Sequence, residues 1–174
     1  MSLGTIEHAK RIKETRKESF RFLEQINKLA DRINFPLSTV ELILKDYRNL
    51  LRYQIEKGQD VTVLGFISIR DAGSSYSWTE TIGSQANHIS KARGISTNIV
   101  LGILEAYYDL IIEELASGAD IVITGLLTLT TKGGRVYLNV SSMVDTDKRG
   151  FILENFKYNL RNFTNGKLFG KNGR

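Results

Sequence analysis

The chain has 174 residues, of which 41% are hydrophobic and 25% charged, with a formal net charge of +5, a balance typical of a soluble globular protein of one or two small domains. It contains no cysteine, so disulfides and thiolate chemistry are excluded. Its only two histidines, His8 and His88, are too few and too far apart in sequence to favour a histidine-based metal site or catalytic triad. We therefore expect no enzyme, no cofactor and no small-molecule substrate. No apolar run approaches the roughly 18 to 20 residues that cross a bilayer, and the N-terminus lacks the apolar region of a signal peptide. We therefore expect no membrane partner. We also expect the protein to act inside the cell that makes it or in a particle assembled there.

The first predicted element is a long amphipathic helix over residues 5–33. A second helix is predicted over residues 38–57, after Pro36 and near Ser38, whose hydroxyl can accept a hydrogen bond from an unpaired amide of the first turn. The first helix rests on apolar residues at mostly helical spacing, which are Ile12, Phe20, Leu23, Ile26, Leu29, Ala30 and Ile33.

Two strands are predicted after the second helix. Gly58 closes the helix, and a β-branched run from Val61 to Ile69, interrupted by Gly65, reads as a strand. Residues 71–75 have turn composition, and residues 76–82 alternate polar and apolar side chains, which predicts a second short strand.

The second part of the chain repeats this order. A short helix over residues 83–93 ends at Gly94, and a helix over residues 97–117 begins near Ser96. A strand follows, and Lys132-Gly133-Gly134 turns tightly into a strand over residues 135–140. A C-terminal helix is predicted at 149–162, and a basic flexible tail at 164–174.

The two parts are internal repeats: residues 37–70 and 97–130 align at a constant offset of 60 without a gap. Tyr47 and Tyr107 occupy equivalent positions, and we expect both in a core or interface with the hydroxyl at its rim. The turns repeat as well as the helices. The helical stripe Val40, Ile43, Leu44, Tyr47 and Leu50 recurs as Val100, Ile103, Leu104, Tyr107 and Leu110.

The run Ile-Glu-Lys-Gly-Gln-Asp-Val-Thr-Val-Leu-Gly-Phe at residues 55–66 resembles the HU/IHF family of DNA-bending proteins, in which a helix pair ends in a glycine turn and enters the sheet through a Gly-Phe pair. Residues 115–126 repeat it as Leu-Ala-Ser-Gly-Ala-Asp-Ile-Val-Ile-Thr-Gly-Leu, with leucine in the last position. The resemblance covers about two-thirds of the chain. The turn and strand residues that define the repeat are Gly58, Asp60, Gly65, Phe66, Gly118, Asp120 and Gly125.

The resemblance implies an α+β protein of two tandem HU/IHF-like units, each a helix hairpin followed by a short antiparallel sheet, with a long N-terminal helix and a C-terminal helix. The expected organisation is residues 1–82 for the N-terminal helix and first unit, 83–163 for the second unit, and 164–174 for the tail. Members of this family are dimers whose helices intertwine around one core. The two units can therefore pair within one chain as a pseudo-dimer, or each with a neighbouring chain, and the sequence leaves this open.

The sequence departs from the family at the arms that grip DNA. Those arms are long, rich in Arg and Lys, and carry a proline that wedges between base steps in the minor groove. Here the one proline, Pro36, precedes a helix, residues 71–82 contain no Lys or Arg, and the second hairpin contributes only Lys132 and Arg135. Phosphate binding needs several cations on one surface, so these hairpins are poor DNA arms.

Two functions follow from this pattern. The first is assembly: the chain is similar to arm-less HU/IHF-like virion proteins of tailed, crAss-like bacteriophages, which implies a structural component of a phage tail or connector ring, with itself and other virion proteins as partners and the virion as its location. The second is an architectural DNA-binding protein of the cytoplasm or nucleoid, with cations at its ends, since residues 148–174 hold seven Lys/Arg against one Asp/Glu. The candidate DNA or partner contacts are Lys10, Arg11, Lys13, Arg16, Lys17, Arg21, Lys132, Arg135, Lys167, Lys171 and Arg174.

Overall fold

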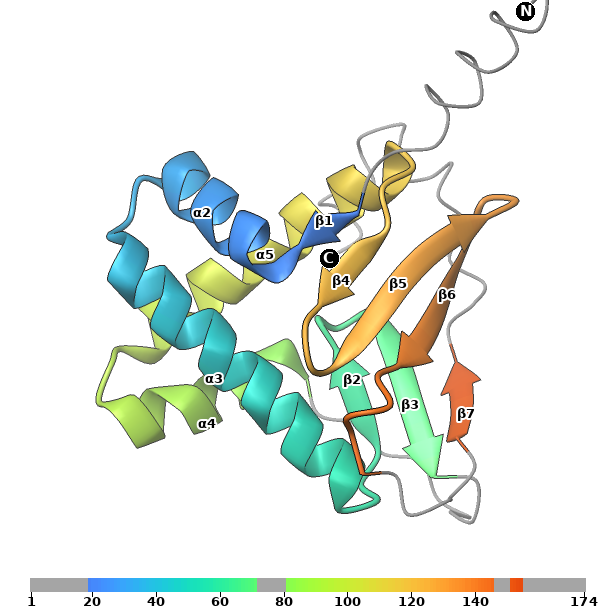
Figure 1. Ribbon diagram of the computed structural model, residues 1–174. Helices are drawn as coiled ribbons and strands as arrows, with labels where there is room; N and C mark the ends of the chain where they lie inside the picture. Colours follow the sequence, from blue (N-terminus) through green and yellow to red (C-terminus); the bar gives the residue numbers. More distant parts are fainter. Residues whose placement is uncertain (1–18, 72–80, 146–150, 155–174) are drawn as a thin grey trace, which may run out of the picture.

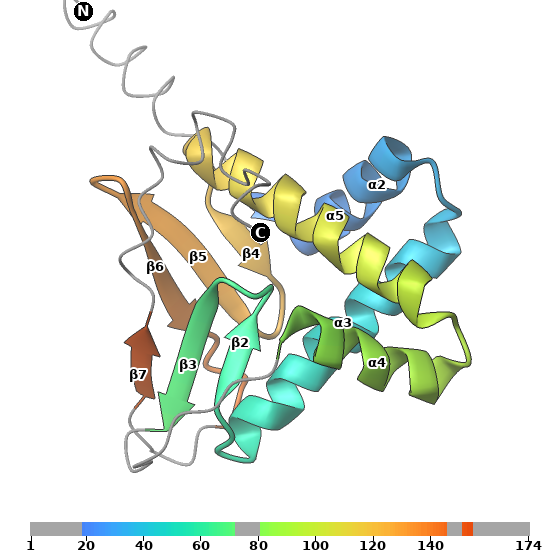
Figure 2. The same cartoon turned by 180° about the vertical axis from the view of Figure 1, so that it is seen from behind.

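The computed structural model describes residues 19–71, 81–145 and 151–154 (Figure 1). The described helices are α2 (Phe22–Ile33), α3 (Leu37–Glu56), α4 (Ile82–Arg93) and α5 (Thr97–Ala116). One sheet has the order β1 (Phe20–Arg21), β4 (Ile121–Ile123), β5 (Leu127–Lys132) and β6 (Arg135–Val140), and the other has the order β2 (Val61–Val63), β3 (Ile67–Asp71) and β7 (Phe151–Glu154). The helices lie on one side of the molecule and the sheets on the other (Figures 1 and 2). The chain is therefore α+β.

The two halves have the same order of elements at an offset of 60 residues. The bounds of α2, α3 and β2 return unchanged as those of α4, α5 and β4, and β3 corresponds to β5. The repeat seen in the sequence therefore extends back to include the first helix of each pair. The helices expected at 38–57, 83–93 and 97–117 are present within one residue of their predicted ends.

The N-terminal helix is shorter than its periodicity predicted. It begins at Phe22, because the residues before it form β1, which pairs in parallel with β4. The Phe20 N–H donates to Asp120 O at 2.7 Å, and the Arg21 N–H donates to Glu24 Oε1 at 2.9 Å at the helix start. Pairing with a strand that is distant in sequence thus replaces the expected helical turn at Phe20. Residues 5–18 of the predicted helix lie outside the described residues.

The predicted C-terminal helix is wrong where the structure describes it. Residues 151–154 form β7, antiparallel to β3, with Leu153 opposite Ile69. Phe151 and Ile152 are an aromatic and a β-branched residue, which favour strands, and the edge of β3 supplies backbone hydrogen-bond partners for this segment. The remainder of the range 149–162, and the tail at 164–174, lie outside the described residues.

The expected strand at 76–82 is also wrong at its end. Ile82 is the first residue of α4, and Thr81 caps that helix by accepting a hydrogen bond from the Ser84 N–H at 3.0 Å. Residues 76–80 lie outside the described residues. The caps expected from Ser38 and Ser96 do not form, because Pro36 is the N-cap of α3 and the Ser96 side chain makes no capping bond to α5.

The buried apolar residues of both halves form one core cluster. The first helix of each half packs against the other half: α2 contacts α5 and β4, and α4 contacts α3. The long helices α3 and α5 cross at the centre of the helical side (Figures 1 and 2). The two repeats therefore pair within one chain.

A buried tyrosine and a buried glutamine join the halves at two equivalent positions. The Tyr47 hydroxyl on α3 donates to Gln85 Oε1 on α4 at 2.8 Å, and the Tyr107 hydroxyl on α5 donates to Gln25 Oε1 on α2. Both tyrosines are at most 2% exposed, so their hydroxyls lie inside the core and not at its rim as expected. Burial raises the pKa of Tyr107, and the nearby Tyr47 adds to the increase, so this hydroxyl is a neutral donor at physiological pH.

The same two glutamines connect the helices to the sheets. Gln25 Nε2 donates to Val122 O at 3.0 Å and to Phe20 O at 2.8 Å, which joins β4 and β1. Gln85 Nε2 donates to Thr62 O on β2 at 2.6 Å. Each glutamine therefore hydrogen-bonds both to a tyrosine and to a strand of the other half.

Tyr107→Phe tests this connection. The substitution leaves Gln25 Oε1 buried without a donor, so we expect the free energy of unfolding to fall by about 1–3 kcal/mol, measured by urea denaturation. Tyr53→Phe, at a position 56% exposed, is the control and should change stability by less than about 0.5 kcal/mol. Equal effects of the two substitutions would show that the buried bond contributes nothing.

Glu56 at the end of α3 holds the segment that follows β6. The Asp145 N–H and Arg52 Nε donate to Glu56 Oε2 at 3.0 Å and 3.1 Å, and these two bonds lower the pKa of Glu56. A depressed pKa in the folded state stabilises the protein above the pKa of the unfolded chain, and this contribution is lost as the pH falls through the folded-state value.

The stability difference between the wild type and Glu56→Gln should accordingly be constant near pH 7 and shrink as the pH falls below about 4.5, the ordinary pKa of a glutamate. Urea denaturation at several pH values measures it. A difference that grows toward low pH would reverse the sign assigned to Glu56.

Candidate binding face of the four-stranded sheet

One face of the four-stranded sheet is turned away from the core. Residues directly opposite each other in neighbouring strands share a face, so the register of β1, β4, β5 and β6 places eight side chains together on this side. None of the eight is acidic. We call them the outer face: Arg21, Val122, Thr128, Thr130, Lys132, Arg135, Tyr137 and Asn139.

The alternation along the strands separates this face from the core. In β6, Val136 and Leu138 are buried, whereas Arg135, Tyr137 and Asn139 are exposed. Successive side chains of a strand point to opposite sides, so the buried members pack toward the helices and the exposed members form the outer face. The polar residues of the outer face are therefore surface groups on a rigid frame.

The hairpin that carries most of this face ends in a two-residue turn. Gly133 and Gly134 have φ values of 60° and 80°, the left-handed conformations that a type I′ hairpin turn requires at both central residues. Lys132 and Arg135 flank the turn and lie opposite each other. The hairpin predicted at Lys132-Gly133-Gly134 is therefore confirmed, and its loop consists of the two glycines alone.

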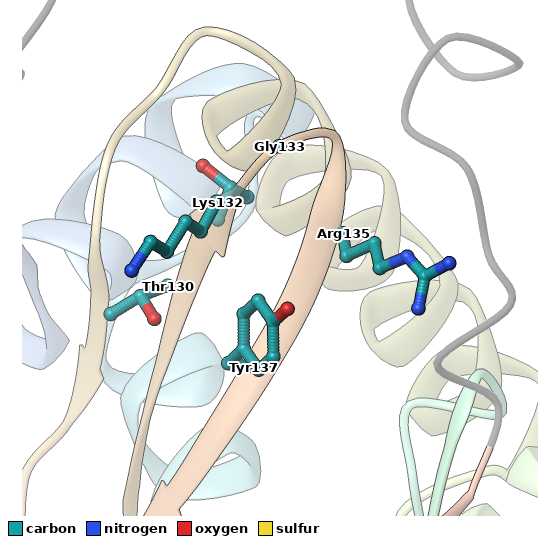
Figure 3. Close-up of a pocket in the computed structure, with 6 residues that line it drawn as sticks. Thr130, Lys132, Gly133, Arg135 and Tyr137 are labelled. Atoms are coloured by element: carbon teal, nitrogen blue, oxygen red, sulfur yellow. The ribbon is translucent and has the colours of Figure 1, made fainter.

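The outer face is hollowed near this turn. A shallow depression of about 680 Å³ lies on the hairpin, with the Lys132 and Arg135 side chains directed to its two sides and the Tyr137 ring between them (Figure 3). Cations beside an exposed aromatic ring and hydroxyl groups suit an acidic ligand that also presents an apolar surface. The lining residues are Thr130, Thr131, Lys132, Gly133, Arg135 and Tyr137.

Lys132 and Arg135 on the outer face differ from three cations on the helices. Lys28 and Arg32 on α2 form ion pairs with carboxylates of α5 at 2.8 Å and 2.9 Å, and Arg93 on α4 pairs with Asp46 on α3 at 2.6 Å. In the part of the chain that the structure describes, Lys132 and Arg135 make no ion pair. Their charge is therefore available to a partner.

The structure places three of the predicted contact residues on one face of the sheet. Lys132 and Arg135 were expected in one hairpin, but Arg21 was assigned to the N-terminal helix and instead reaches the outer face through β1. No local pattern around Arg21 indicates this parallel pairing. The other candidates lie outside the described residues: Lys10, Arg11, Lys13, Arg16, Lys17, Lys167, Lys171 and Arg174.

The residues that define the repeat build turns and contribute no side chain to the outer face. Gly58, Gly65, Gly118 and Gly125 all have positive φ values, and Phe66 packs edge-on against Tyr108 of the other half with ring centroids 5.5 Å apart. Asp60 and Asp120 immediately precede β2 and β4. Their role is to set how the helices enter the sheets.

Sequence reasoning missed two kinds of residue. Gln25 and Gln85 were not recognised, although their spacing of 60 matches the repeat offset and would have identified them as equivalent polar core positions. Tyr137 lies at an ordinary strand position, so only its place between Lys132 and Arg135 in the folded hairpin marks it as part of a site (Figure 3).

The chain matches no model of a known protein family, and a search of curated proteins found no significant match. Among the described residues, no three His, Cys, Asp or Glu side chains are grouped so that they could hold a metal ion. None of the helices in the described ranges is both long and apolar enough to cross a membrane. The functional argument therefore depends on the geometry and charge of the outer face.

The turn geometry leads to a paired prediction. Gly134→Ala places a Cβ in a left-handed conformation and should lower the free energy of unfolding by about 1–2 kcal/mol. Gly133→Asn should be tolerated within about 0.5 kcal/mol, because asparagine adopts this conformation readily. Urea denaturation of both variants measures the difference, and an equal loss in the two would argue against the type I′ turn.

Proposed function

We propose that the protein is a structural assembly protein with an HU/IHF-like fold, a component of a phage tail or connector ring that makes protein–protein contacts in an oligomer. Its partners are further copies of itself and other virion proteins, and its location is the virion. The resemblance in sequence introduces this proposal, and the arrangement of the two halves supports it.

The support for the fold comes from how the halves interlock. Each half is a helix hairpin followed by antiparallel strands, and the first helix of each packs on the other half. The HU/IHF-like dimers that the sequence resembles also share one core between two intertwined copies. A single chain that holds both copies corresponds to such a dimer with its subunits joined.

The observation that carries the assembly role is the short β5–β6 hairpin. At this position an arm that grips DNA would be long and cationic, but the hairpin closes at Gly133-Gly134 with only Lys132 and Arg135 beside it. Three helix cations, Lys28, Arg32 and Arg93, are already paired with carboxylates of the opposite half. The hairpin itself thus offers two cations to phosphates, fewer than an arm that grips DNA would supply, which favours protein partners over a duplex at this hairpin.

The second candidate is an HU/IHF-like architectural DNA-binding protein that uses its basic N- and C-terminal segments. One observation favours it: Arg21, Lys132 and Arg135 share a face on which no strand residue is acidic. This face could add to the charge of the termini in contacting phosphates.

Light scattering on the purified protein distinguishes the two functions. We expect concentration-dependent assembly into a closed oligomer whose mass is unchanged by adding a duplex of about 30 base pairs, because protein contacts and not phosphate contacts hold it together. The measurement is made at low and at high salt, with bovine serum albumin as a control for non-specific association with the duplex.

A monomer that shifts onto the duplex at low salt and leaves it at high salt would instead support DNA binding. In that event, alanine substitution of Lys10, Arg11 and Lys13 should reduce the salt dependence of binding if the N-terminal segment supplies the contacts. An unchanged salt dependence would remove that segment from the interface.

A further inference from the structure

Two ion pairs join the first helix of the first half to the second half. Lys28 Nζ on α2 lies 2.8 Å from Glu114 Oε2 on α5. The Arg32 guanidinium donates to both carboxylate oxygens of Glu113 at 2.9 Å and 3.0 Å. The planar fork of an arginine fits a carboxylate in one orientation, so a two-bond pair fixes geometry as well as charge. These contacts therefore orient α2 on α5.

A third ion pair makes the reciprocal contact, between α4 and α3. Arg93 donates to both carboxylate oxygens of Asp46, at 2.6 Å and 2.9 Å. The side chain of Asp46 is 17% exposed and that of Glu114 is 20% exposed, so the pairing of the halves removes most of the water around both carboxylates. Leaving a largely buried carboxylate without its cation is costly. Each half therefore needs a cation at the correct position of the other half.

The residues that form these ion pairs are not repeated in the two halves. Two first halves paired in the same geometry would set Asp46 against Ile33 instead of Arg93, and two second halves would set Arg93 against Ala106. Only a first half with a second half forms all three ion pairs. At the offset of 60 residues, the equivalents of the six charged residues include no lysine, arginine or carboxylate; they are Ile33, Tyr53, Gln54, His88, Ala92 and Ala106.

The hydrogen bonds of the core do not make this distinction. Tyr47 and Tyr107 are equivalent in the repeat, as are Gln25 and Gln85, so two like halves would form the same buried bonds. Selection between partners is a difference between their affinities, and it has to come from contacts that differ between the halves. The three ion pairs are contacts of this kind.

We propose that the three ion pairs determine which partner each half accepts. They direct the first half to a second half and reject a like half of another copy, whatever the chain assembles with. Exposed ion pairs add little to stability, but mismatched charges penalise a wrong partner, and selection requires such a penalty. In an oligomer, where halves of neighbouring copies lie close together, this selection keeps like halves from pairing.

Charge reversal on one side of the boundary tests the selection. K28E/R32E and E113K/E114K each set like charges against each other within one chain. If the two variants exchange halves, the reversed first half of one meets the reversed second half of the other, and the two native halves meet each other. Both boundaries are then matched. We therefore expect the two variants, refolded together from urea, to form pairs of chains with exchanged halves.

A site-specific cross-link measures the exchange, because the chain has no cysteine of its own. Arg52 Nη2 donates to Met143 O at 2.7 Å across the boundary, so R52C is added to the E113K/E114K chain and M143C to the K28E/R32E chain. Exchange brings these two positions together, where a short bismaleimide joins them. The cross-linked dimer should be at least about tenfold more abundant than in a mixture of the same two cysteine variants with native charges.

The control replaces K28E/R32E by K57E/K91E with the same M143C reporter. It changes the net charge equally, at exposed positions outside the three ion pairs. Mixed with the E113K/E114K chain it gains no matched boundary by exchange, so cross-linking should stay at the level of the native charges. Equal cross-linking in the two mixtures would show that net charge alone brings the chains together, and would overturn the proposal.

No rise in cross-linking between the two reversed variants, with both shown to be folded by circular dichroism, would also overturn it. If either variant does not fold alone, the single chain K28E/R32E/E113K/E114K decides, because it restores the match within one chain. Its urea midpoint should return to near the wild-type value, and a chain that stays unfolded would contradict the assignment. Light scattering reports separately whether the protein forms the oligomer proposed above, so the two proposals fail independently.

Discussion

Buried polar groups must find hydrogen-bond partners, and in this protein the partners of two glutamines come from the opposite repeat. Gln25 and Gln85 are both fully buried, and each is bonded to a tyrosine and to a strand carbonyl across the boundary between the halves. A half on its own would leave these groups unsatisfied at a cost of several kcal/mol. The halves therefore complete each other's core, and the position of each sheet depends on the other half's first helix.

The repeats share this frame but have diverged around it. The turn between β2 and β3 packs Phe66 against Tyr108 of α5, whereas the equivalent turn between β4 and β5 meets arginines of α3, with Arg48 donating to Thr124 O at 3.5 Å. The third strand also differs, since β6 follows β5 through a tight turn while β7 reaches β3 from far along the chain. The residues that the two repeats share form the common core. The differences between the repeats give the four-stranded sheet an outer face that the three-stranded sheet does not share.

Local patterns predicted the elements whose partners are close in sequence. The stripe that begins at Val40 and its copy at Val100 gave α3 and α5, and the Gly133-Gly134 turn gave the β5–β6 hairpin, because helical periodicity and turn chemistry act over a few residues. The failures share the opposite property. Phe20 joins a strand that lies a hundred residues further along the chain, and Phe151 joins β3 eighty residues back. Such pairings override weak local preferences and leave no local trace.

The sequence by itself determined the repeat, the α+β class and the hairpin that brings Lys132 and Arg135 together, because each is encoded in the spacing of nearby residues. The tertiary structure decided that the repeats pair within one chain and that Arg21 shares a face with the hairpin. Both features depend on hydrogen bonds between segments that are far apart in sequence, made by buried side chains and by the backbone groups at strand edges. That selection is made only when the whole core forms.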